Sequence, residues 1–244
     1  MRVLCAIPVF NEAKYVERVL AQIRRFATDV LVLDDGSTDA TPQILQRIAD
    51  IRVIRHAENR GYGQSLIDAF KFAEAHNYDW IITLDCDEQH EPSLIPRFID
   101  WAQRDDVDVI SGSRYLAPGP GETAAPEDRR KINEQITELL NETLGLSLTD
   151  AFCGFKAHRV SAMSRLSLSI PGYAFPLQFW VQVAHHGLRL CELPVPLIYH
   201  DPNRHFGGIL DDPDSRLQHY RDVFRAELAH VACCGSPIGC ATAL

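Results

Sequence analysis

Two aspartates separated by a single residue follow an apolar run and could hold a divalent cation. The stretch ITLDCDEQH, residues 82–90, ends with Asp85 and Asp87 and then adds a glutamate, a glutamine and a histidine. Like charges this close repel each other unless a counter-charge lies near them. Carboxylates at i and i+2 of an irregular turn can direct oxygens at one Mg²⁺ or Mn²⁺, which would also offset a ligand's diphosphate. An isolated D-x-D is more often a solvated turn, so the surrounding motifs must show whether this one binds a metal ion.

Polar residues also follow two other apolar runs. Asp34 and Asp35 come after LVL, and the segment GSR, which includes Arg114, comes after VDVI. Ligands of open parallel sheets bind outside the carboxyl ends of the strands, so we expect these residues to share a crevice with Asp85 and Asp87. The alternative for the DDGS segment is a turn followed by a helix cap, because Asp, Gly and Ser all suit turns.

The elements that must position these residues alternate along the chain. Short β-branched runs occupy 2–9, 29–34, 51–56, 79–85 and 107–113, and segments of helical period occupy 12–26, 40–49, 63–76 and 92–104. This βαβ pattern predicts an α/β fold with a mostly parallel central sheet flanked by helices. Further along the chain we expect helices at 128–145, 174–187 and about 214–232, and strand-like segments at 150–158 and 189–200.

Composition narrows the class of protein. The 244 residues are 46% hydrophobic and carry a formal net charge of −9, which argues against a generic nucleic-acid binder. Seven cysteines are an odd number and lie mostly in apolar segments, as expected for reduced thiols. The chain reads as a strand directly from Met1, without a secretory signal, and has no apolar run of about 18 residues. We therefore expect a cytoplasmic protein without a transmembrane segment, and peripheral membrane contact stays open.

Two segments are expected to be mobile. Residues 116–127 form a long loop rich in Pro, Gly and Ala, which we expect to close over an acceptor. The C-terminal cluster of His230, Cys233, Cys234 and Cys240 has adjacent cysteines rather than C-x-x-C spacing. A flexible tail with free thiols is therefore favoured over a zinc site.

The ordered set of motifs over residues 3 to about 208 resembles the family 2 glycosyltransferases of GT-A fold. Within them it is similar to dolichol-phosphate mannosyltransferases and related polyprenyl-phosphate sugar transferases. The motifs are IPVFNEAKYV, LVLDDGSTDATPQIL, NRGYGQSLIDAF, the D-x-D segment, SGSRY and LTDAFCGFKAHR. Each is weak alone, but the combination is specific.

That resemblance implies a Rossmann-like GT-A domain in three parts. Residues 1–115 would form the nucleotide-sugar half, 116–210 the acceptor-side half, and 211–244 a C-terminal helix and tail. The implied reaction moves a sugar from a GDP- or UDP-linked donor to an acceptor, either a lipid phosphate or a sugar. The reaction would invert the configuration at the anomeric carbon and would use Mg²⁺ or Mn²⁺.

The resemblance also implies roles for individual residues. Those on the donor side are Pro8, Asn11, Glu12, Asp34, Asp35, Asn59, Gly61, Gly63 and Asp85. The metal ligands are Asp85, Asp87 and Gln89. Arg114 and Arg204 fall on the acceptor side, and Asp87 and Asp150 at catalytic positions. Simpler alternatives are that both glycines merely open a helix, that Asp150 caps or pairs with a nearby arginine, and that the arginines are surface charges.

Two departures from the family pattern stand out. Relatives commonly read D-A-D-G-Q-H where this chain reads D-C-D-E-Q-H, so Glu88 adds a carboxylate, either as an outer-sphere partner of the metal or as a solvated side chain. The polyprenyl-phosphate enzymes typically follow R-x-x-G with a Ser-Lys pair, and here Ile209 and Leu210 stand after the glycines.

The chemistry can also be argued from the residues. Displacing a nucleoside diphosphate builds negative charge on the leaving oxygen, which a cation stabilises. A phosphate nucleophile is already ionised, whereas a hydroxyl needs a carboxylate base, for which Asp150 is the candidate. Two other functions remain open. A nucleotidyltransferase would normally have a basic, Gly-rich phosphate loop near the start of the chain, and VFNEAKYV is not such a loop. A binding or scaffold protein would bind nucleotide sugars without turnover.

Overall fold

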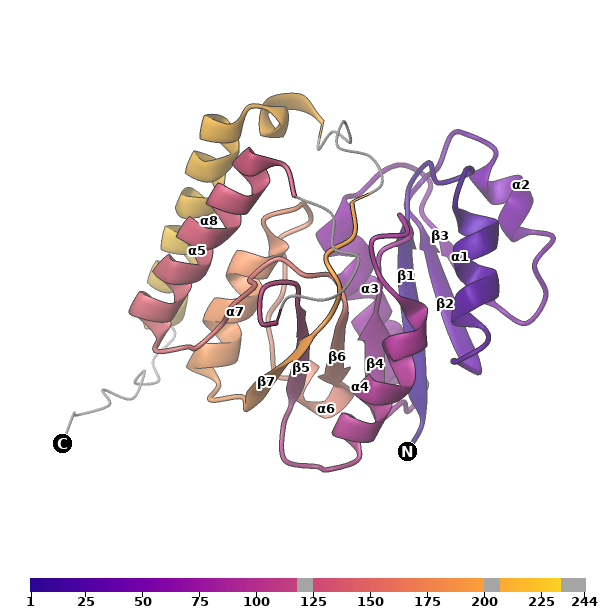
Figure 1. Cartoon of the computed structure of the whole chain (residues 1–244), viewed down its shortest axis with the longest axis horizontal. Coiled ribbons are helices and arrows are strands. Elements are labelled where there is room, and N and C mark those ends of the chain that lie inside the picture. Colours follow the sequence, from indigo (N-terminus) through magenta and orange to yellow (C-terminus); the bar gives the residue numbers. More distant parts are fainter. Residues whose placement is uncertain (118–124, 200–206, 234–244) are drawn as a thin grey trace.

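Seven strands form one sheet in the part of the chain that the structure describes, residues 1–117, 125–199 and 207–233 of a computed structural model (Figure 1). They are β1 (Val3–Val9), β2 (Asp29–Asp34), β3 (Arg52–Arg55), β4 (Trp80–Thr83), β5 (Val109–Ser113), β6 (Lys156–Arg159) and β7 (Leu190–Pro194). Their order in the sheet is β3-β2-β1-β4-β6-β5-β7. Only β6 runs antiparallel to its neighbours, β4 and β5, so the prediction of a mostly parallel sheet is confirmed.

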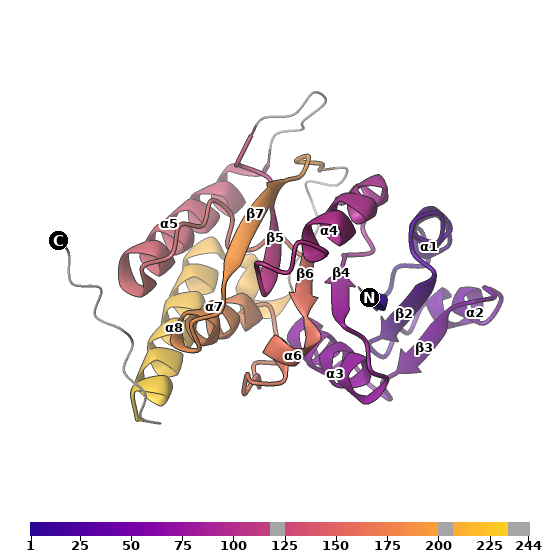
Figure 2. The ribbon, with the colours of Figure 1, turned by 90° about the horizontal axis from the view of Figure 1, so that it is seen from below.

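Helices cover both faces of this sheet. One face packs against α1 (Val16–Ile23), α2 (Thr41–Leu45) and α4 (Ile95–Ala102), which follows the short η1 (Pro92–Leu94). The other packs against α3 (Tyr62–Ala75), α5 (Glu127–Leu144), α6 (Val160–Met163) and α7 (Phe175–His185). Figure 2 shows α1 and α4 on one side of the sheet and α3, α6 and α7 on the other.

The strands are apolar on both sides for this reason. In β1, Leu4 and Ala6 belong to the core under α3, whereas Cys5, Ile7 and Val9 belong to the core under α1. All five residues are at most 2% exposed. A strand buried on both faces has no polar alternation, which explains its continuous apolar sequence.

The C-terminal helix α8 (Pro213–Cys233) lies beside α5 and α7, at one end of the sheet (Figure 1). Its buried residues recur at helical spacing along one stripe: Arg216, Tyr220, Phe224, Glu227 and Val231. Within this stripe the carboxylate of Glu227 accepts hydrogen bonds from Nε2 of Gln178 (2.9 Å) and Nε2 of Gln182 (2.7 Å) on α7. A polar contact therefore fixes the register between α7 and α8.

Most element predictions are confirmed within a few residues. The sequence analysis did not predict η1 as a separate element, α6, or the short η2 (Gly208–Asp211), because elements of three or four residues show no measurable period. Most of the predicted loop 116–127 and of the predicted tail lies outside the described residues, as do Cys234 and Cys240. The five cysteines among the described residues are all free thiols. No helix among the described residues is long and apolar enough to cross a membrane.

Replacing Glu227 should destabilise the docking of α8. Glu227→Ala leaves two buried amides without their shared acceptor, so we expect the free energy of unfolding to fall by about 1–3 kcal/mol in urea titrations. Glu138→Ala, on the exposed side of α5, is the control and should change it by less than about 0.5 kcal/mol. Equal effects of the two changes would contradict this account.

Candidate active site

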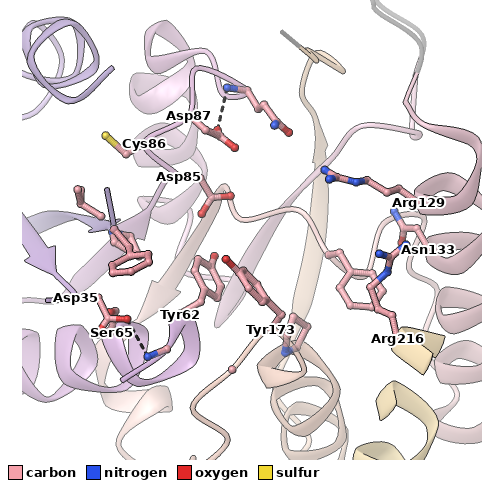
Figure 3. A pocket seen from close by; sticks show the side chains of 18 of the residues that line it. Asp35, Tyr62, Ser65, Asp85, Cys86, Asp87, Arg129, Asn133, Tyr173 and Arg216 are labelled. Carbon is pink, nitrogen blue, oxygen red and sulfur yellow. Dashed lines mark hydrogen bonds between the residues drawn. The ribbon is translucent and has the colours of Figure 1, made fainter. Parts of the chain in front are cut away.

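A cavity of about 480 Å³ opens where β1, β2, β4 and β5 end. The segments that follow these strands supply one part of its wall, and α5 and α8 supply another. Four of the five polar residues expected to converge, Asp35, Asp85, Asp87 and Arg114, line the same cavity, and the fifth, Asp34, does not. Figure 3 shows the three aspartates of this group.

The predicted site residues divide into three groups. Those that line the cavity are Pro8, Glu12, Asp35, Asn59, Gly61, Asp85, Asp87, Gln89 and Arg114. Those that do not are Asn11, Asp34, Gly63 and Asp150. Arg204 lies outside the described residues.

Asp35 fastens the loop at 59–61 to the end of β2. One carboxylate oxygen accepts from the backbone N–H of Arg60 and the other from that of Gly61, both at 2.8 Å. His56 Nδ1 lies 2.6 Å from the first of these oxygens. Gly61 has φ +101°, and a Cβ there would lie 2.3 Å from the carbonyl oxygen of Pro171, so only glycine fits. Asp35 thus orders the loop that carries Asn59 and Gly61.

Asp34 and Asn11, both predicted on the donor side, make contacts within the fold and do not line the cavity. Asp34 is fully buried: one carboxylate oxygen accepts from the N–H of Ser37 (3.0 Å) and the other lies 3.2 Å from Arg55 Nε. It therefore has the turn role that was the alternative for this segment. Asn11 accepts from the N–H of Thr38 (2.8 Å) through Oδ1, so it joins the loops after β1 and β2 rather than facing the cavity.

Gly63, also predicted on the donor side, has a packing role in the structure. A Cβ at this position would lie 2.2 Å from the carbonyl oxygen of Ile170. The first turn of α3 can approach the segment 170–172 only because position 63 has no side chain.

Asp85 and Asp87 form the acidic part of the wall. The backbone N–H of Gln89 donates to Asp87 (3.1 Å), and His90 Nε2 lies 3.1 Å from a carboxylate oxygen of Asp85. Gly154 is equally important, because a Cβ there would lie 2.2 Å from Oδ2 of Asp85. Sequence reasoning quoted the segment that contains Gly154 but gave it no role.

This wall fits a hard cation bound together with a diphosphate. Among the described residues no cluster of three or more His, Cys, Asp or Glu is arranged to hold a metal ion. Asp85, Asp87 and Gln89 nevertheless bring carboxylate and amide groups to one cavity. Mg²⁺ and similar ions typically take one or two carboxylates and complete their shell with substrate phosphates and water. Donor oxygens would therefore supply the remaining ligands.

Two tyrosines lie close to the acidic wall. The rings of Tyr62 and Tyr173 stack with centroids 5.9 Å apart, and Figure 3 shows their hydroxyl ends directed toward Asp85. Burial, and then the negative charge of Asp85, raises the pKa of Tyr62 well above its usual value. Tyr62 therefore stays neutral and can donate its O–H. Its place inside NRGYG was the available signal; nothing in the sequence singled out Tyr173.

At the far end, Arg114 and Asp150 form a bidentate pair. Arg114 Nε donates to Asp150 Oδ2 (2.6 Å) and Nη2 donates to Oδ1 (2.9 Å), while Asn133 Nδ2 also donates to Oδ1 (2.8 Å). Burial alone would raise the pKa of Asp150, but the charge of Arg114 and these hydrogen bonds outweigh it and lower that pKa to about 2.

The surroundings of Asp150 argue against the predicted role as a general base. Its carboxylate is fully buried, accepts several hydrogen bonds and does not line the cavity, so it is poorly suited to take a proton from a substrate. The alternative, pairing with a nearby arginine, is what the structure has. Asp150 positions Arg114, which does line the cavity.

Two more arginines stand across the cavity from the aspartates. Figure 3 shows Arg129 of α5 and Arg216 of α8 opposite Asp85 and Asp87. Arg216 is 3% exposed and donates to Asp128 (2.6 Å) and to the carbonyl of Leu210 (2.8 Å). Sequence reasoning predicted both helices but could not tell which of their arginines face the site. The cavity is acidic on one side and basic on the other.

The chain is similar to known sugar transferases. Residues 5–167 match the sequence profile described as Glycosyl transferase family 2. An undecaprenyl-phosphate mannosyltransferase of Micrococcus luteus is 28% identical over 223 residues, which cover 87% of this chain and 90% of that protein. A polyprenol monophosphomannose synthase of Mycolicibacterium smegmatis is 25% identical over 204 residues, or 80% of this chain and 76% of that protein.

A solved structure shares the fold. Glucosyl-3-phosphoglycerate synthase from Mycobacterium tuberculosis, in complex with Mn²⁺, UDP and glucosyl-3-phosphoglycerate, aligns with a TM-score of 0.69 at 19% identity. The alignment covers 97% of this chain and 81% of that one. The predicted GT-A fold is confirmed.

A methyl group at position 154 should displace the Asp85 carboxylate. We expect Gly154→Ala to weaken Mn²⁺ binding by at least about tenfold, measured in the presence of UDP or GDP, while the circular dichroism spectrum stays native. The control is Gly145→Ala, which strains a left-handed position (φ +68°) at the end of α5 but meets no atom within 4 Å. It should lower thermal stability and leave Mn²⁺ affinity unchanged. Similar affinities for both variants would contradict the proposed packing.

Asp150 should make stability depend on pH in acid. Its pKa falls from 3.8 to about 2 on folding, so its contribution is complete above about pH 4 and is lost as the pH falls toward 2. The gap in unfolding free energy between the wild type and Asp150→Asn should therefore shrink by about 2 kcal/mol over that range. The exposed variant Asp214→Asn should run parallel to the wild type. A gap for Asp150→Asn that does not change with pH would contradict this assignment.

Proposed function

The chain belongs to glycosyl transferase family 2, and on that premise we propose that it transfers a sugar from a nucleoside-diphosphate donor to a phosphate-bearing acceptor. The observation that carries this proposal is the separation of charge across the cavity. Asp85 and Asp87 line one side, and Arg129 and Arg216 line the other (Figure 3). Arg114 also lines the cavity and shares its partner Asp150 with Asn133 of α5, the helix that carries Arg129. A site with this polarity suits a cation-bound diphosphate next to a second anion.

The acidic side is the proposed donor site. Asp85 and Asp87, with Gln89, would hold Mg²⁺ or Mn²⁺ against the diphosphate, and the loop ordered by Asp35 would contact the GDP or UDP nucleoside. The bound cation would supply positive charge to the leaving diphosphate. The neutral Tyr62 hydroxyl lies on the same side, where it interacts with the Asp85 carboxylate.

The basic side is the proposed acceptor site. A phosphate monoester is largely ionised at neutral pH and attacks without a strong base. This requirement agrees with the state of Asp150, which is committed to Arg114. Guanidinium groups suit phosphate because they can donate two parallel hydrogen bonds. Arg204, outside the described residues, stays a proposed acceptor contact.

The acceptor that these features favour is a polyprenyl phosphate. The names of the two relatives include undecaprenyl phosphate and a polyprenol product, which supports this choice. The phosphate oxygen would attack the anomeric carbon, and the bond to the diphosphate would break with its electron pair leaving on the nucleotide. A single displacement inverts the configuration. Because such acceptors are carried in membranes, the enzyme would work at a membrane surface.

Asp87→Asn should abolish metal-dependent turnover. Replacing the carboxylate by an amide removes one anionic ligand and so lowers the affinity of the site for the cation that would offset the charge of the leaving diphosphate. We therefore expect sugar release from UDP- or GDP-sugars with Mn²⁺ to fall by about 100-fold or more. Thermal unfolding should show that the variant is folded. Full activity of the variant, or activity that survives exhaustive chelation, would rule the role out.

Two further assays distinguish the other functions. Release of pyrophosphate from UTP or GTP in the presence of a sugar 1-phosphate, with formation of the nucleoside-diphosphate sugar, would identify a nucleotidyltransferase. Binding of nucleotide sugars that is never followed by turnover, with either polyprenyl phosphates or neutral sugars as acceptors, would identify a binding protein.

A further inference from the structure

Glu88 has a backbone conformation that residues with side chains rarely adopt. Its φ is +62°, in the left-handed region, and it lies between Asp87 and Gln89 in the loop after β4. In this region Cβ crowds the neighbouring carbonyl, so glycine is favoured. The glutamate therefore carries a local cost that its side chain must offset.

The side chain makes its contact with a distant helix. The Glu88 carboxylate forms an ion pair with Arg18 of α1, a residue 70 positions earlier in the sequence. Glu88 is 17% exposed in its side chain and lines a second cavity, bounded by α1 and the loop, rather than the donor cavity. It is therefore not the solvated side chain that was one of the two alternatives for this residue.

This ion pair connects the loop to the rigid part of the fold. The hydrogen bonds of Gln89 to Asp87 and of His90 to Asp85 both run within the loop. Helix α1 is fixed by four side chains, Val16, Val19, Leu20 and Ile23, each at most 4% exposed. Arg18 projects from the same helix. The pair can thus transmit the position of α1 to the middle of the loop.

We propose that Arg18 and Glu88 are positioning residues for the cation site. Their ion pair holds the loop so that Asp85 and Asp87 are already near the arrangement that takes the cation. A loop ordered in advance loses less conformational freedom on binding, so its affinity for the cation is higher. The inference rests on the proposed function, since it assumes a cation at these two aspartates.

Mn²⁺ titration of the full chain tests this. The electron paramagnetic resonance signal of free Mn²⁺ is followed with saturating UDP in one series and GDP in another. Arg18→Ala and Glu88→Gln should each raise the dissociation constant of Mn²⁺ about twofold to fivefold, because the Arg18 side chain is 63% exposed and water weakens the ion pair. The double variant should be no weaker than the weaker single variant, because both changes remove one interaction. Arg18→Lys, which keeps the charge, should retain most of the affinity.

Two further variants separate positioning from stability. Glu88→Gly relieves the left-handed strain but loses the pair, so the thermal midpoint should stay or rise while Mn²⁺ affinity falls. Arg24→Ala removes the ion pair of Arg24 with Asp50 at the other end of α1 and should not change Mn²⁺ affinity. In metal-free protein, amide hydrogen exchange over residues 85–90 should be faster in Arg18→Ala than in Arg24→Ala.

The outcomes separate this inference from the proposed function. Normal Mn²⁺ binding by the wild type together with unchanged binding by Arg18→Ala and Glu88→Gln overturns the inference alone. Strictly additive effects of the two changes overturn it as well. If the wild type binds no Mn²⁺ with either nucleotide, the cation site and the inference both fail.

Discussion

The mutual repulsion of Asp85 and Asp87 is the constraint that the donor side of the cavity must satisfy. Two carboxylates so close in the chain separate unless neighbouring groups hold them. Gly154 leaves room for the Asp85 carboxylate, and His90 lies within hydrogen-bonding distance of it. The N–H of Gln89 bonds to Asp87, and Glu88 reaches Arg18. The loop after β4 thus has a contact at nearly every position, and the negative charge that it concentrates suits the proposed cation.

The basic side solves the converse problem. A chain with a net charge of −9 must hold an anionic ligand by local cations, since its overall field is repulsive. The carboxylate of Asp150 sits behind Arg114 and orients its guanidinium, and Asp128 does the same for Arg216. Each arginine therefore has its own fixed partner, so little side-chain freedom remains to be lost when a ligand binds. The buried carboxylate of Asp150 thus orients the guanidinium of Arg114 and does not serve to move a proton.

The sequence was a reliable guide where function depends on local patterns. The strand at 29–34 and the helix at 63–76 follow from hydrophobic period, and the pair Asp85 and Asp87 follows from its place after an apolar run. Contacts between distant segments could not be predicted this way. Nothing in the spacing of residues shows that Gly154 touches Asp85, or that Asp150 is saturated by Arg114 and Asn133. Asp34 and Asn11 illustrate the same limit, because side chains that serve turns and side chains that serve ligands have the same types at the same positions.

The reversed direction of β6 has a consequence for how the protein is made. Because β6 runs against β4, Lys156 at its start pairs with Thr83 at the end of β4, and Gly154 accepts a hydrogen bond from the Thr83 hydroxyl. Synthesis proceeds from the N-terminus, so both aspartates leave the ribosome some 70 residues before the backbone that shapes their pocket. A nascent chain that ends before residue 154 carries the whole acidic motif but not its supporting wall.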